Sequence, residues 1–304
     1  MLCHFGANSL TLQAPAKVNL FLKVLGRRTD GFHELETLMV PVGLYDTVQL
    51  EQTSSEHIEF SVRSCGRPAG GESVVNQQSE IPEGRTNLVV RAAEALREAT
   101  GSSAGARIVL HKRIPAAAGL AGGSSDAAAA LFGLNHLWRL GLPTAELHVF
   151  AAQLGSDVPF FLSSTAAICR GRGEIIEPVR CLPRLHLVIV RPREGLATAE
   201  VFQHCKPTES RWSANDLANA LARGDLGLAG QQLHNCLLEP ASTLSEDVRE
   251  LRRIFAKLPV LGHMMSGSGT SYFGICAHRK HARPVAARLH ATRIGSVFTV
   301  ESRP

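Results

Sequence analysis

The chain lacks the features that mark disulfide-stapled, zinc-binding and membrane-spanning proteins. Its seven cysteines are odd in number and scattered, and no two of them form a Cys-x-x-Cys pair. This pattern is typical of reduced thiols and argues against both a disulfide framework and a cysteine zinc site. Lys17 and Asn19 interrupt the apolar run after Leu10, so we expect neither a signal peptide nor a membrane span. These absences predict a cytoplasmic protein.

Charge of one sign is nowhere concentrated either. The chain has 32 Lys and Arg against 27 Asp and Glu, a formal charge of +5, and its basic runs are short, such as Arg27-Arg28. A nucleic-acid-binding protein usually carries a clustered basic stripe, so we expect no nucleic-acid partner. The balance permits an anionic small-molecule substrate. With 304 residues, 44% of them hydrophobic, the chain is long enough for one large or two ordinary domains.

What the chain does contain is a glycine- and alanine-rich stretch from Pro115 to Leu131, PAAAGLAGGSSDAAAAL. Gly119, Gly122 and Gly123 allow the backbone to turn sharply and to approach a ligand closely. Ser-Ser-Asp followed by alanines predicts a helix that begins near Ser125. Unpaired N–H groups and the helix dipole favour an anion at such a start. We therefore expect a phosphate site, the alternative being a plain turn before a buried helix.

Two common phosphate loops do not fit this stretch. No Gly-Lys-Ser/Thr follows the glycines, which excludes a Walker A loop, and no Gly-x-Gly-x-x-Gly is present. The stretch instead resembles the Pro-x-x-x-Gly-Leu-x-x-Ser-Ser loop of the GHMP kinases. Residues 15–20, PAKVNL, followed by residues 28–35, RTDGFHEL, are similar to a branch of that family whose substrate is a cytidine-diphosphate-linked alcohol. The glycine-rich residues 265–275 resemble the family's third motif.

The resemblance implies a fold of the α+β class with two domains. Residues 1–178 would form the N-terminal GHMP kinase domain, which carries the phosphate loop and resembles the second domain of ribosomal protein S5. Residues 179–304 would form the C-terminal GHMP kinase domain, which is ferredoxin-like. The activity implied is ATP-dependent phosphorylation of an alcohol group in isoprenoid biosynthesis, with Mg²⁺ as the metal.

Several local patterns predict individual elements. Pro15 predicts two short strands around it in place of one long strand, because proline lacks the N–H of a central strand. Alternation of apolar and polar residues over 47–51 and 58–62 predicts antiparallel strands with one solvated face. An apolar stripe predicts a helix from Leu226 to Leu238. Residues 64–84 are rich in Gly, Ser, Glu and Pro and predict a long surface loop.

The resemblance assigns a catalytic pair. Asp157, in Gly-Ser-Asp-Val-Pro, stands where the family carries its catalytic aspartate, a general base for the attacking hydroxyl. On turn chemistry alone Asp157 would cap a turn. Lys17 would neutralise the developing alkoxide and keep Asp157 ionised, whereas spacing alone favours a solvent-exposed strand lysine. Ser124 or Ser125 would orient Mg²⁺. The residues expected to bind ATP are Pro115, Ala116, Ala117, Ala118, Gly119, Leu120, Ala121, Gly122, Gly123, Ser124 and Ser125.

The resemblance also assigns a substrate site. Phe32 would stack on the cytosine and His33 would read its edge, although His33 fits a hydrogen-bonded turn equally well. Phe202 would be a second stacking aromatic. Asn19 would contact the diphosphate or another polar part of the substrate. Asn87 and Lys112 stand where the family places groups near adenine. We expect a monomer or a weak homodimer.

The chain departs from its relatives at several positions. Phe32 replaces a frequent tyrosine, which removes a hydroxyl and keeps the stacking face. Alanines at 116–118 and 121 replace residues that are often Gly or Met. Asp126 replaces an asparagine and is taken as structural. Two other functions stay open: another GHMP kinase, such as homoserine or mevalonate kinase, or an RNA-binding protein, because the N-terminal fold resembles a ribosomal domain.

Overall fold

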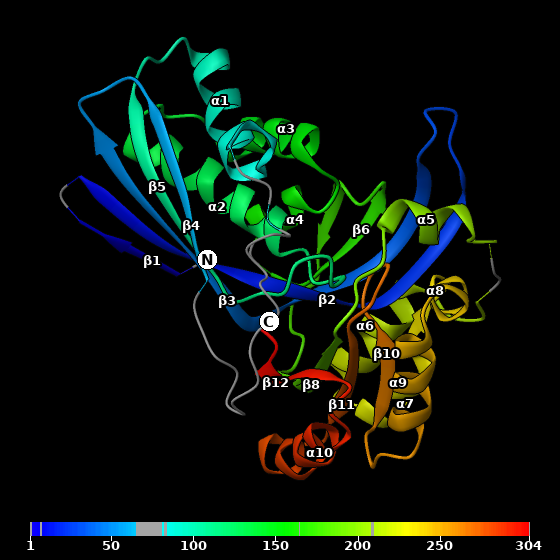
Figure 1. Cartoon of the computed structure of the whole chain (residues 1–304). Helices are drawn as coiled ribbons and strands as arrows, with labels where there is room; N and C mark the ends of the chain where they lie inside the picture. Colours follow the sequence, from blue (N-terminus) through cyan, green and yellow to red (C-terminus); the bar gives the residue numbers. More distant parts are fainter. Residues whose placement is uncertain are drawn as a thin grey trace. The chain divides into compact units, whose positions relative to one another are not determined.

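The computed structural model describes residues 2–6, 8–64, 81, 84–163, 165–207 and 210–303 (Figure 1). Its backbone contacts divide the chain into two compact units. Unit 1 comprises Met1–Ala16, Leu44–Ala116 and Ala121–Ser164, and unit 2 comprises Lys17–Gly43, Ala117–Leu120 and Thr165–Pro304. The domain boundary between residues 178 and 179 stays a prediction. Most of the loop expected at 64–84 lies outside the described residues.

The sheet of unit 1 places strands that are distant in sequence beside one another. Strand β1 (Leu2–Phe5) pairs antiparallel with the start of β2 (Ser9–Arg27). The end of β3 (His33–Thr53) pairs antiparallel with β5 (Gly105–Lys112). Strand β4 (Ile58–Ser64) pairs parallel with β5 on its other side. The two segments predicted as antiparallel strands therefore run in opposite directions but are separated by β5.

Among the described residues of unit 1, helices α1 to α4 follow the strands, and α1 to α3 lie together beside β4 and β5 (Figure 1). Helix α1 begins after Asn87, whose side chain accepts a hydrogen bond from the N–H of Val89 at 2.9 Å. Helix α2 packs closely on the sheet at Gly133, because a Cβ there would lie 2.3 Å from Leu50 and 2.8 Å from Leu12. The helical segments are η2 (Gly84–Thr86), α1 (Leu88–Thr100), α2 (Gly122–Leu137), α3 (Thr144–Leu154) and α4 (Val158–Ser163).

Strand β2 is continuous through Pro15, so the prediction of two short strands was wrong. Along one edge, β2 pairs with β1 over residues 10–13 and with β9 (His234–Asn235) over residues 21–22. Pro15 falls between these two paired segments, where a strand ladder needs no N–H from it. Two residues further on, the N–H of Lys17 donates to the carbonyl oxygen of Leu120 at 3.1 Å.

Unit 2 contains a four-stranded antiparallel sheet in the order β10-β11-β8-β12. In chain order its strands are second, third, first and fourth, which is the ferredoxin-like arrangement expected. The four strands are β8 (His186–Pro192), β10 (Gly262–Met265), β11 (Tyr272–Cys276) and β12 (Gly295–Glu301). Their core side chains, such as Val188 and Tyr272, pack against Leu251 and Phe255 of α9.

The predicted helix from Leu226 to Leu238 was wrong, because the chain leaves the helix after Gln232 and forms β9. Asn235 donates hydrogen bonds to the carbonyl oxygens of Met265 and Gly267 and accepts one from the N–H of Leu237. These long-range bonds replace helical ones. The remaining elements of unit 2 are β6 (Ala167–Gly171), β7 (Ile175–Pro178), α5 (Thr198–Gln203), α6 (Ala214–Ala222), α7 (Leu226–Gln232), α8 (Leu238–Leu244), α9 (Glu246–Ala256) and α10 (Arg279–Thr292).

None of the helices in the described part of the chain combines the length and apolar character that crossing a bilayer requires.

Candidate active site

Lys17 is a buried cation and not a solvent-exposed strand lysine. Every residue from Ala14 to Leu22 is buried, and Lys17 itself is only 3% exposed. Its ammonium group donates hydrogen bonds to the side-chain oxygen of Asn19 at 2.5 Å and to the carbonyl oxygen of Gly119 at 3.1 Å. A buried charge requires such partners, since leaving it unpaired is costly. Unit 2 thus holds a fixed positive charge against one residue of the predicted phosphate loop.

Asn19 is held in turn by two hydroxyl groups of unit 2. Its amide nitrogen donates to the hydroxyl of Thr37 at 2.8 Å, and that hydroxyl donates to the carbonyl oxygen of Phe21 at 2.6 Å. The backbone N–H of Asn19 donates to the hydroxyl of Ser266 at 3.2 Å. The side chain of Asn19 is therefore oriented by the sheet and in turn orients the ammonium group of Lys17.

The glycine-rich segment before β11 packs directly on loop residues 117–120. The hydroxyl of Ser266 donates to the carbonyl oxygen of Gly119 at 2.9 Å, and the N–H of Ser271 donates to the carbonyl oxygen of Ala118 at 3.1 Å. Gly119 has a φ of 72°, and a Cβ on it would lie 2.1 Å from the Ser266 carbonyl oxygen. Glycine is the residue that tolerates both conditions. Asn235 supports this segment through the two carbonyls described above, a role that the sequence analysis missed.

The start of α2, in unit 1, differs from the expectation in its position. The helix begins at Gly122, preceded by Ala121 with a φ of 55°. A Cβ at Gly122 would lie 2.9 Å from Ile114, so glycine allows the first turn to form against the segment that follows β5. The Ser125 hydroxyl and the Asp126 Oδ1 are buried and have no hydrogen-bond partner within the described part of the chain. Two unpartnered oxygens at a helix start fit a cation or a polar ligand group.

A buried charge cluster connects the two ends of this loop in unit 1. The ammonium group of Lys112 contacts carboxylates of Asp46 and, at 2.9 Å, Asp126. Asp46 also accepts hydrogen bonds from the N–H groups of Arg113 and Ile114, at 2.6 and 2.9 Å. Burial raises the pKa of Asp126, and the Asp46 carboxylate raises it further against the opposing effect of Lys112. Burial would lower the pKa of Lys112, but the carboxylates of Asp126 and Asp46 raise it overall.

Asp157 lies half-buried in unit 1 between α3 and α4. The chain turns there, with the N–H of Val158 donating to the carbonyl oxygen of Gly155 at 3.2 Å. Asp157 therefore stands one residue before a short helix, in a turn defined by its neighbours' backbone. Its pairing with Lys17 stays a prediction.

The predicted substrate aromatics lie in unit 2. The rings of His33 and Phe202 are in contact, with 5.3 Å between their centroids. The neighbouring Phe32 is 49% exposed, and its N–H donates to the carboxylate of Asp30 at 3.1 Å. The guanidinium carbon of Arg172 lies 4.6 Å from the centroid of the Phe32 ring. Arg172 did not enter the sequence analysis as a site residue.

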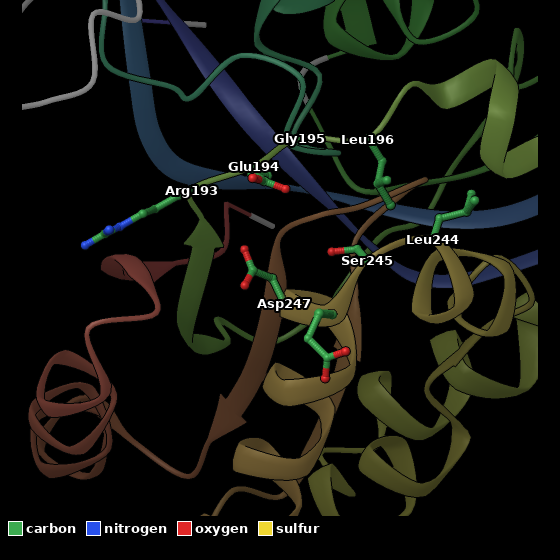
Figure 2. Close-up of a pocket in the computed structure, with 8 residues that line it drawn as sticks. Arg193, Glu194, Gly195, Leu196, Leu244, Ser245 and Asp247 are labelled. Carbon is green, nitrogen blue, oxygen red and sulfur yellow. The ribbon is translucent and has the colours of Figure 1, made fainter.

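A separate cavity of about 280 Å³ lies within unit 2 (Figure 2). None of the predicted site residues lines it. The carboxylate of Asp247 points toward the segment that carries Glu194 (Figure 2), and burial and the Glu194 charge raise the pKa of Asp247. The lining residues are Arg193, Glu194, Gly195, Leu196, Leu244, Ser245, Glu246 and Asp247. Elsewhere, no group of three or more His, Cys, Asp or Glu suited to a metal ion occurs among the described residues.

Comparison with known families assigns a class to this fold and loop. Residues 87–165 match the model of the GHMP kinases N terminal domain, and residues 217–294 match the model of the GHMP kinases C terminal domain. A solved homoserine kinase from Cytophaga hutchinsonii, 17% identical, has the same fold, with a TM-score of 0.73 over 100% of this chain and 97% of the other. The chain is a GHMP kinase, and the predicted fold class is confirmed.

More similar relatives narrow the family. A 4-diphosphocytidyl-2-C-methyl-D-erythritol kinase of Pelotomaculum thermopropionicum is 43% identical over 93% of this chain and 94% of its own. A crystal structure of 4-(cytidine 5'-diphospho)-2C-methyl-D-erythritol kinase is 36% identical, with a TM-score of 0.78 over 97% of this chain and 99% of the other. This chain belongs to the 4-diphosphocytidyl-2-C-methyl-D-erythritol kinase family. It is an ATP-dependent small-molecule kinase.

Proposed function

We propose that this kinase transfers the γ-phosphoryl group of ATP to the 2-hydroxyl of 4-diphosphocytidyl-2-C-methyl-D-erythritol, a step of isoprenoid biosynthesis. The observation that carries the proposal is the buried Lys17 ammonium held against the Gly119 carbonyl. A fixed cation beside a phosphate loop is what phosphoryl transfer requires, since that reaction depends on positioning and charge stabilisation. The names of the similar relatives support the choice of substrate.

Asp157 is the proposed general base. Its carboxylate accepts the proton of the substrate's 2-hydroxyl as the hydroxyl oxygen bonds to the γ-phosphorus. The bond between that phosphorus and the β,γ-bridging oxygen breaks, and ADP leaves with the electron pair. Lys17 supplies positive charge for the oxygen as it loses its proton. Asn19 keeps the Lys17 ammonium in place through the 2.5 Å hydrogen bond.

The loop from Pro115 to Ser125 is the proposed site of the ATP phosphates. Backbone N–H groups at the start of α2 are donors for phosphate oxygens. The unpartnered Ser125 hydroxyl and Asp126 Oδ1 fit Mg²⁺, because hydroxyl and carboxylate oxygens are the ligands it prefers. Ser124 or Ser125 would hold it. When bound, Mg²⁺ neutralises part of the phosphate charge.

The cytidine end of the substrate is assigned to unit 2. Phe32 offers an exposed ring on which a pyrimidine stacks. The contact between His33 and Phe202 makes a second aromatic surface, and the imidazole of His33 supplies a polar edge. Asn19 is the proposed contact for the diphosphate or another polar part of the substrate, because its amide has a second N–H and a second lone pair beyond those used by Thr37 and Lys17.

A coupled assay of ADP release tests the proposal. It would use ATP, Mg²⁺ and 4-diphosphocytidyl-2-C-methyl-D-erythritol, with homoserine and mevalonate in parallel. Turnover with the cytidyl substrate alone is expected. Turnover with homoserine or mevalonate instead would overturn the cytidine site and keep the kinase class. ATP binding measured with and without added RNA separates the kinase from an RNA-binding protein, since RNA is expected to leave it unchanged.

A further inference from the structure

Arg172 contacts the ring that the proposed substrate would stack on. Its guanidinium carbon lies 4.6 Å from the centroid of the Phe32 ring. We propose that Arg172 is a positioning residue for cytosine recognition, holding one face of Phe32 so that the other face is presented to the base. The inference rests on the proposed function, because that function supplies the base.

Phe32 gains little orientation from its own turn. The turn over residues 28–32 is closed by backbone groups, with the N–H of Arg28 donating to the carbonyl oxygen of Phe32 at 2.8 Å. The N–H of Phe32 donates to Asp30 at 3.1 Å. These bonds fix the backbone and leave the half-exposed ring to be fixed by side-chain contacts. If the exposed ring became ordered only when the base binds, the affinity for the substrate would be lower, because the ring would lose its rotamer freedom at that step.

Arg172 is well placed to supply this order because its own turn is anchored to the same strand. Gly171 pairs with Leu35 of β3, and its N–H donates to the Glu34 carboxylate at 3.1 Å. The N–H of Arg172 donates to the Glu174 carboxylate at 2.6 Å. Strand β3 begins one residue after Phe32, so the turn that carries Arg172 and the turn that carries Phe32 are both attached to the same strand.

The chemistry of the pair favours arginine at this position. A guanidinium is planar and delocalised and packs on an aromatic face, attracted by the negative charge above the ring. Lysine keeps the charge but lacks the plane. The nearby acids are partly engaged elsewhere, since Arg28 pairs with both Asp30 and Glu34. The Arg172 guanidinium also lies 3.9 Å from the Glu174 carboxylate, so Glu174 helps to hold it beside the Phe32 ring.

Steady-state kinetics of Arg172→Gln and Arg172→Lys test the proposal. The Gln variant is expected to raise KM for the cytidyl substrate about two- to fivefold, the worth of an exposed cation–π contact. The Lys variant should lie between it and the wild type. Neither kcat nor the KM for ATP should change, and the melting temperature should stay the same. Arg184→Gln is the matched control, because Arg184 is an exposed arginine paired with Glu301 at 3.5 Å.

A double-mutant cycle with Phe32→Leu decides how Arg172 acts. If Arg172 acts through the ring, Arg172→Gln raises KM in the wild type and adds nothing in the Phe32→Leu background. An equal increase in both backgrounds would overturn the proposal and indicate a direct contact with the substrate's diphosphate. No increase in the wild type would overturn it as well. Absence of wild-type turnover would instead reject the proposed function, so the two failures are distinguishable.

Discussion

The ammonium group of Lys17 donates a hydrogen bond to the carbonyl oxygen of Gly119, although 102 positions separate the two residues in the chain. The hydroxyl of Ser266 donates to the same carbonyl, from a segment 147 positions beyond Gly119. One loop carbonyl therefore joins strand β2, the loop and the glycine-rich segment within unit 2. The position of the cation and the shape of the loop are coupled through this oxygen.

Replacing Lys17 with methionine should lower kcat while leaving most of the fold intact. The variant removes the buried charge and two charge-assisted hydrogen bonds, so we expect a loss of turnover of roughly ten- to a hundredfold. Gly119 keeps Ser266 as a partner, but Asn19 loses one. Lys23→Met, on the same strand and half-buried, is the control and should keep the wild-type rate. Near-normal turnover of Lys17→Met would contradict the assigned role.

Replacing Asp157 with asparagine tests the general base. The change is isosteric and removes the proton acceptor, so we expect kcat to fall by about 10²–10⁴-fold. Binding of ATP, measured by calorimetry, should persist. Asp225→Asn is the control, because Asp225 only caps α7 through the N–H of Leu228 and asparagine caps equally well. If both variants turn over normally, another group must accept the proton.

Replacing Lys112 with methionine should destabilise unit 1. The change leaves the buried Asp46 carboxylate without its cation and removes the partner of the Asp126 carboxyl group, and removing one partner of a buried ion pair costs about 3 kcal/mol or more. Urea unfolding followed by circular dichroism measures the loss. Arg107→Met removes an exposed cation that pairs with Glu59, so no measurable change is expected there. If both variants lost equal stability, burial of the charge cluster would contribute nothing to the stability of the protein.

The stability of the protein should depend on the protonation of Asp126. Because burial raises its pKa to about 8, the folded state binds a proton more tightly than the unfolded state does. That contribution is fully present at acid pH and is lost as pH rises from the ordinary carboxyl range toward 8. Between about pH 5 and pH 8, the free energy of unfolding measured with urea should decline less for Asp126→Asn than for the wild type. An identical decline in both proteins would show that Asp126 does not cause the pH dependence of stability.

Local patterns in the sequence predicted much of the architecture. Glycines and alanines around Ser124 and Ser125 indicated a loop entering a helix, and that helix is present. Its start moved to Gly122 because the first turn packs against Ile114, which follows strand β5. Asn87 caps helix α1 through its side chain, a role that its residue type favours. Such elements depend on neighbours in sequence, which a pattern records.

Burial and pairing were not readable in the same way. Alternation placed Lys17 on one face of a strand, but both faces of β2 are buried there, so the residue types did not distinguish a solvated face. The apolar stripe over 226–238 did not reveal the break at β9, which forms because Asn235 bonds to carbonyls about 30 positions away.

By itself, the sequence determined the family, because its motifs are short patterns of residue type and spacing, and through that resemblance it determined the fold class. The phosphate loop and the residues for chemistry stay predictions from the same motifs. Only the tertiary structure decided that Lys17 is buried against Gly119, that Lys112 lies between two carboxylates, and that Arg172 covers Phe32. The physical reason is that a charge's burial and its partners depend on residues brought together from distant parts of the chain, and no local pattern encodes those contacts.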